Sequence, residues 1–140
     1  MKEDKLSDLS MQLSVDVLKL TRELKAKHET IISNQIGRSA TSVCANIAES
    51  KYGHSRADFI AKLEIALKEA NETSYWLLLL VKTNILHPAE YDRLENLCRE
   101  MGEGNFTVNS GCTAAYVGDF RELLNSIETM KQNVRDTLLE

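Results

Sequence analysis

The sequence is poor in residues that interrupt helices. Of its 140 residues, one is proline and six are glycine, and four of those glycines fall between residues 102 and 118. In a helix interior, proline and glycine cost about 3 and 1 kcal/mol relative to alanine. Their scarcity elsewhere leaves room for long helices, and no segment shows the polar–apolar alternation of a half-buried strand. An all-α fold is therefore expected.

Long apolar runs and cysteine pairs are also missing. The longest apolar run, Trp76 to Val81, has six residues, whereas a helix needs about 20 to span a bilayer. The polar start, MKEDKLSDLS, does not have the pattern of a secretory signal. Cys44, Cys98 and Cys112 are isolated in the sequence, which favours free thiols in a reducing compartment. We expect a cytoplasmic protein without a membrane segment.

Positive charge is scarce as well. The chain has 17 Lys and Arg residues against 21 Asp and Glu residues, a net charge of −4, and no run rich in Lys or Arg. With a pI of about 5.4, this composition argues against a strong non-specific polyanion binder. A basic patch assembled from several copies stays open as an alternative.

Patterns that carry chemistry are absent from the sequence. It contains no Glu-x-x-His pair of the di-iron bundles, no phosphate-binding glycine loop, no nucleophile elbow and no His-Glu-x-x-His motif. The three histidines, His28, His54 and His87, fall at expected helix ends. We expect no enzyme activity, no cofactor and no metal.

The apolar residues of the chain recur with the spacing of amphipathic helices. The first expected helix covers about residues 5 to 27, and its apolar positions recur every three or four residues, as in a packed helical seam. These positions are Leu6, Leu9, Leu13, Val17, Leu20 and Leu24. The second helix begins near Thr30 or Ser33 and ends near Tyr52 and Gly53, where Gly53 is a candidate C-cap. Its core face is expected at Ile32, Ile36, Ala40, Val43 and Ile47.

A third helix is expected from about Arg56 to Thr83, opened by a capping box at Ser55 to Asp58. Its predicted seam consists of Ile60, Leu63, Leu67, Ala70, Ser74, Leu77 and Val81. A fourth helix begins near Pro88 and is interrupted by a loop or insertion at about residues 102 to 118. After this loop, Asp119 is the candidate N-cap of a last helical segment that extends to about Leu139. Short connections predict one domain over residues 1 to 140, an up-down-up-down four-helix bundle with an interrupted fourth helix.

The third helix is apolar on every side from Tyr75 to Val81. A helix of that kind is buried on every side, and one small bundle does not easily cover its whole circumference. We therefore expect a subunit interface that includes Tyr75, Trp76 and Leu79, since aromatic residues are enriched at interfaces. Burial within the chain is the alternative.

A polar stripe accompanies the core face of the second helix. Its members are Gln35, Arg38, Ser42, Asn46 and Glu49. We interpret the stripe as an interface or structural network, in which Arg38 donates to a carboxylate of a neighbouring helix and Asn46 bridges backbone groups. The alternative is that these residues contact a ligand or RNA.

Two runs of the sequence resemble one known family, the four-helix-bundle proteins that include the ribosomal RNA intervening-sequence proteins. The first run supplies Gln35, Ile36, Arg38, Ser39, Ser42, Val43, Ala45, Asn46, Ile47, Ala48, Glu49 and Ser50. The second supplies Asp58, Phe59, Leu63, Ile65, Ala66 and Glu72. The resemblance covers roughly residues 6 to 100. Ser50 replaces the family's glycine, Gly37 replaces a frequent basic residue, and residues 102 to 118 interrupt the fourth helix.

The resemblance implies a homo-oligomer, commonly a ring of five, and carries over no catalytic residue. It also implies a relation to accessory proteins of diversity-generating retroelements, which bind a reverse transcriptase and nucleic acid. Two functions are therefore expected as alternatives. One is a non-enzymatic oligomeric assembly or adaptor module, and the other is a nucleic-acid-binding accessory protein that works with a reverse transcriptase or ribosomal RNA. The acidic pI and Gly37 weaken the second.

Overall fold

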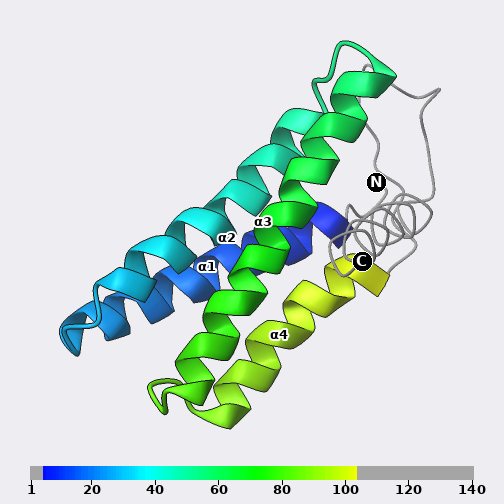
Figure 1. The fold of residues 1–140 in the computed structure, drawn as a ribbon. Helices are drawn as coiled ribbons and strands as arrows, with labels where there is room; N and C mark the ends of the chain where they lie inside the picture. Colours follow the sequence, from blue (N-terminus) through cyan, green and yellow to red (C-terminus); the bar gives the residue numbers. More distant parts are fainter. Residues whose placement is uncertain (1–4, 104–140) are drawn as a thin grey trace, which may run out of the picture.

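The computed structural model describes residues 5 to 103, which form four helices (Figure 1). They are α1 (Lys5–Ala26), α2 (Ile31–Ser50), α3 (Arg56–Lys82) and α4 (Pro88–Glu103). Each helix packs against the next, and α4 returns to pack against α1. Short turns join them, so the expected all-α up-down-up-down bundle is confirmed. The predicted segment from Asp119 to Leu139 and all but the start of the predicted loop before it lie outside the described residues.

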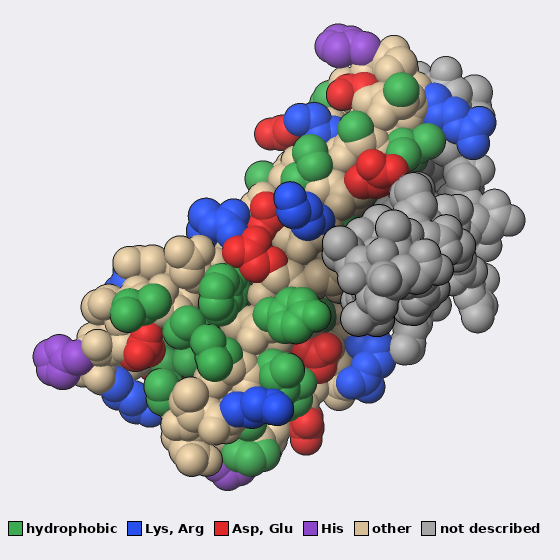
Figure 2. All heavy atoms as spheres, viewed as in Figure 1, with side chains coloured by type: hydrophobic (Ala, Val, Ile, Leu, Met, Phe, Trp, Pro, Cys, Tyr) green, Lys and Arg blue, Asp and Glu red, His purple; other side chains and the backbone are tan. Residues whose placement is uncertain are grey.

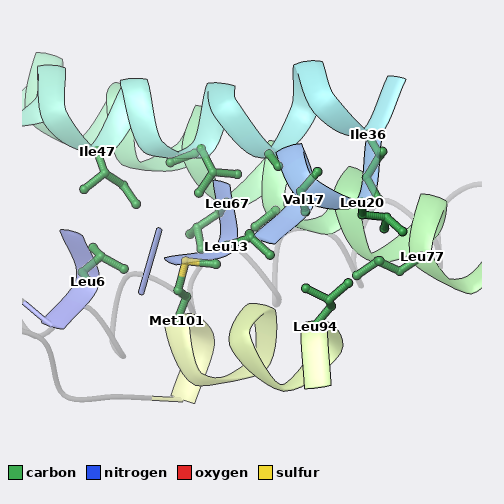
Figure 3. Packing of buried hydrophobic residues seen from close by; sticks show 14 of the residues in the cluster. Leu6, Leu13, Val17, Leu20, Ile36, Ile47, Leu67, Leu77, Leu94 and Met101 are labelled. Atoms are coloured by element: carbon green, nitrogen blue, oxygen red, sulfur yellow. The ribbon is translucent and has the colours of Figure 1, made fainter. Parts of the chain in front are cut away.

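The core lies along the axis of the bundle and draws on all four helices (Figure 3). The first two helices bury the faces predicted from their periodicity, with Leu9 and Ile32 only partly covered. From α4, Leu94 and Met101 point into the same core. Full burial of a side chain of this size stabilises the fold by about 1.5 to 3 kcal/mol. The core therefore holds the four helices together without help from the outer surface.

The buried face of α3 differs from the predicted seam. Predicted members Ile60, Ser74 and Val81 are only half-buried. The buried positions of α3 are Phe59, Leu63, Ala66, Leu67, Ala70, Thr73, Leu77 and Leu80. The reason is that α3 packs against both α2 and α4, so its buried arc is wider than one seam and extends toward α2.

The turn before α3 corrects a second expectation. Ser55 caps α3 as predicted, because its side chain accepts a hydrogen bond from the backbone N–H of Asp58 at 3.1 Å. Gly53, however, is not the C-cap of α2, which ends at Ser50 and is capped by Lys51, and its φ is not positive. A Cβ at Gly53 would lie 3.2 Å from the backbone nitrogen of Phe59. The chain approaches closely there, so a side chain at this position would have less room than usual.

A buried carboxylate connects the first helix to the last. The guanidinium of Arg93 on α4 donates to Asp16 on α1 at 2.8 Å, and Gln12 donates to the same oxygen at 3.0 Å. Burial by itself raises the pKa of Asp16, but these hydrogen bonds and the charge of Arg93 outweigh burial and lower the pKa below its ordinary value of 3.8. The ionised form of Asp16 therefore stabilises the fold.

We predict that Asp16→Asn lowers the free energy of unfolding by about 1 to 2 kcal/mol at pH 7. Because the pKa of Asp16 is lowered on folding, its contribution is present above pH 3.8 and is lost as pH falls through the folded-state pKa. Urea unfolding at pH 7 and at pH 3 checks this, with Asp92→Asn on the exposed side of α4 as the control. A difference between wild type and variant that does not shrink at pH 3 contradicts the assignment.

Candidate functional site

The residues singled out from the sequence gather on one side of the molecule, the outer surface of α2 and α3, which we call the α2–α3 face. The two helices are antiparallel, and contacts join them at several levels along their length. Glu49 meets Lys62 at one end, while Ser39 meets Thr73 and Arg38 meets Glu72 further along. This register brings Arg38, near one end of the polar stripe, close to the aromatic end of α3, while Glu49 lies at the opposite end of the face.

Two small hydroxyl residues lie beneath this face and join the helices inside the core. The hydroxyls of Ser39 and Thr73 are 2.8 Å apart and fully buried. Within its own helix, the Ser39 hydroxyl is also within hydrogen-bonding distance of the carbonyl oxygen of Ile36. The Thr73 hydroxyl is likewise within hydrogen-bonding distance of the carbonyl oxygen of Glu69. Both polar groups are thus satisfied, and their small size lets the helices approach closely. Thr73 was not singled out from the sequence, since its partner is distant in the chain.

A charged cluster, formed by Arg38, Glu69 and Glu72, lies on the surface above this bond. The guanidinium donates to Glu69 at 3.3 Å and to Glu72 at 2.5 Å. The bond to Glu72 raises the pKa of Arg38, and in turn the bond from Arg38 lowers the pKa of Glu72 against the opposing effect of burial. One cation thus meets two carboxylates, so the charged cluster carries a net charge of −1.

The rest of the polar stripe divides into separate contacts. Glu49 pairs with Lys62 on α3 at 2.9 Å, and this bond raises the pKa of Lys62, although an exposed pair contributes little to stability. Asn46 donates to the carbonyl and hydroxyl of Ser42 within α2, so these two residues do not reach another helix. Gln35 is exposed on the surface.

Apolar side chains continue the face toward the C-terminal end of α3. Tyr75 is 66% exposed and Leu79 is 42% exposed, and Ile31 at the start of α2 is also exposed. Figure 2 shows hydrophobic side chains gathered over the lower part of this side, with acidic and basic side chains adjacent to one another at its middle. Contiguous exposed apolar surface with aromatic residues is typical of a protein-binding region.

Trp76 lies between the charged cluster and this apolar surface. Its side chain is half-buried, and its indole N–H is buried without a hydrogen-bond partner. Trp76 also contributes to the lowered pKa of Glu72, which places the indole near that carboxylate, one turn away, but outside hydrogen-bonding geometry. The charged and apolar parts of the face are therefore in direct proximity.

A second exposed apolar surface lies on α1, formed by Met11, Val15 and Leu18, and we call it the α1 stripe. Met11 is 56% exposed, and the other two are about as exposed as Leu79. The stripe follows a helical spacing on the side of α1 away from the core, and Arg22 extends it by one turn. Sequence inspection missed it because the inward-facing leucine seam dominates the pattern of this helix.

The described residues show neither a metal-binding cluster nor an activated thiol at Cys98. Between Lys5 and Glu103, no group of three or more His, Cys, Asp or Glu side chains could hold a metal ion. Burial raises the pKa of the Cys98 thiol to about 12, which is the opposite of what a nucleophilic cysteine requires. In the same part of the chain, no helix has the length and apolar character needed to cross a membrane.

Comparisons with known proteins agree on one family. The model of a family described as 23S rRNA-intervening sequence protein matches residues 2–104. A crystal structure of a protein of unknown function, from the S23 ribosomal protein family of Bacteroides thetaiotaomicron, is 38% identical. That match covers 87% of this chain and 96% of the other, with a TM-score of 0.68. A search of curated proteins finds no match.

We predict that the Ser39–Thr73 bond holds the α2–α3 face in register. Thr73→Val preserves shape while removing the hydroxyl, so the free energy of unfolding should fall by about 1 kcal/mol. Ser39→Ala should cost a similar amount, and the double variant should cost less than the sum by about 0.5 kcal/mol or more. Urea unfolding of the four proteins measures this coupling, and strictly additive losses contradict a direct bond.

Proposed function

The chain belongs to the 23S rRNA-intervening sequence protein family, and we propose that it is a non-enzymatic, homo-oligomeric assembly or adaptor module whose copies meet through the α2–α3 face. The observation that carries the proposal is the exposure of Tyr75 and Leu79 beside Trp76, on a bundle whose described residues already bury a core drawn from all four helices. Aromatic and aliphatic residues placed in this way bury apolar area on association.

The α1 stripe is the complementary surface that supports a second copy as the occupant. Because α1 and α3 lie diagonally across the bundle, Tyr75 and Leu79 on α3 do not pair with the α1 stripe within one copy. On α1 the exposed basic residues Lys19, Arg22 and Lys25 outnumber the exposed acidic residues Asp8 and Glu23, whereas the charged cluster carries a net charge of −1. Apolar area and charge are thus both complementary between one copy's α2–α3 face and the next copy's α1 stripe.

A contact between two different surfaces is heterologous, and heterologous contacts close into rings when the rotation between copies allows it. We propose a closed ring in the cytoplasm. Five subunits is the number that the family resemblance favours.

Two single variants test this arrangement. We predict that Leu79→Asp, which places a charge in the α2–α3 face, and Val15→Asp, which places one in the α1 stripe, each abolish the oligomer. Mixed together, the two variants should form a one-to-one dimer through their intact surfaces. Sedimentation velocity measures the species, circular dichroism checks that each monomer is folded, and Asn96→Asp on the exposed side of α4 is the control.

Other outcomes contradict the arrangement. If α2–α3 faces paired with each other, Val15→Asp alone would still dimerise. If neither surface were used, both variants would keep the wild-type size.

The alternative function, binding to nucleic acid, is favoured by one observation. Lys19, Arg22 and Lys25 near the end of α1, and Lys27 in the turn that follows it, are all exposed. Against it, Arg38 is occupied by two carboxylates and is not available to a phosphate.

We predict no binding of RNA or single-stranded DNA at about 50 mM salt, measured by fluorescence anisotropy. Phosphate contacts weaken steeply with salt because counterions are released. Binding at 50 mM that disappears by about 200 mM and weakens in Arg22→Glu would favour the alternative instead.

A further inference from the structure

The charged cluster borders the apolar part of the α2–α3 face, at the place where association would remove water. Glu69 and Glu72 are three residues apart on α3, so their carboxylates lie on one side of the helix and repel each other. Their side chains are largely covered already, at 15% and 30% exposed, whereas Arg38 is 51% exposed. The guanidinium therefore lies over the two carboxylates on the solvent side.

In a single copy, water screens these charges, and an ion pair with a half-exposed arginine contributes little to folding. The contribution of this ion pair to stability changes when a second copy covers the face, because the charges then lose the water that screens them. A carboxylate that loses its water without a partner is strongly destabilising, whereas a paired and hydrogen-bonded carboxylate is tolerated. Arg38 thus stabilises the associated form, in which the face is covered, more than it stabilises the isolated bundle.

We propose that Arg38 neutralises Glu69 and Glu72 so that the α2–α3 face can be buried against a second copy of the chain. This inference rests on the proposed assembly and names what controls it. Arg38 acts on association, and the hydrophobic core together with the Ser39–Thr73 bond maintains the fold. The apolar surface beside Trp76 assembles only while the two carboxylates beside it are paired.

The test compares removal of the arginine with removal of the charges that it neutralises. Arg38→Ala should weaken association by at least about tenfold, as truncation of one partner of a buried charge pair does. Its helix content should stay close to wild type, and so should its thermal midpoint when both proteins are measured at a concentration low enough to be monomeric. In Arg38→Ala combined with Glu69→Gln and Glu72→Gln, association should return to within about threefold of wild type.

Sedimentation velocity over a concentration series provides the association constants. Glu90→Ala is the matched control, because it breaks an ion pair on α4, a helix that contributes to neither proposed contact surface, and should leave association unchanged. If Arg38→Ala assembles as tightly as wild type, or the triple variant stays dissociated, the inference is overturned while the proposed assembly stands. A wild-type chain that remains monomeric overturns both.

Discussion

The close antiparallel contact between α2 and α3 is the constraint on which the rest of the structure depends. Ser39 and Thr73 are small enough to let the helices approach, and their mutual hydrogen bond allows both hydroxyls to be buried. Because this contact fixes the register, Arg38 lies opposite Glu69 and Glu72, and Glu49 lies opposite Lys62. A shift of one turn would separate every one of these pairs.

Folding and the proposed association bury two different sets of apolar side chains. The leucines and isoleucines of the core are buried by the bundle itself, so the fold does not require Tyr75, Leu79 or the α1 stripe to be covered. Each of these residues keeps apolar area in contact with water, and covering it is favourable at about 25 cal/mol per Å². A stable bundle with two exposed apolar surfaces is therefore well suited to association between folded copies.

Periodicity predicted the helices and much of the core because both depend on local pattern. It identified five of the six apolar seam positions of α1 as buried, and the ends of α3 to within one residue. It identified four of the seven predicted seam positions of α3 as buried but overlooked Thr73, because which side of a helix is covered depends on where its neighbours lie. The Arg93–Asp16 contact spans 77 residues in sequence, and no local pattern encodes such a pair. Gly53 was likewise expected to be the C-cap of α2, but it lies in the turn after the helix, close to the backbone of Phe59.

The proposed assembly covers the α2–α3 face with another copy of the chain. Hydroxyl-radical footprinting, read by mass spectrometry over a range of protein concentrations, tests it most directly. Tyr75 lies on the face, whereas Tyr52 lies in the turn after α2 and is similarly exposed, at 77% against 66%. Tyr75 should become protected as concentration rises, while Tyr52 should continue to react. Equal reactivity of the two tyrosines at every concentration would contradict it.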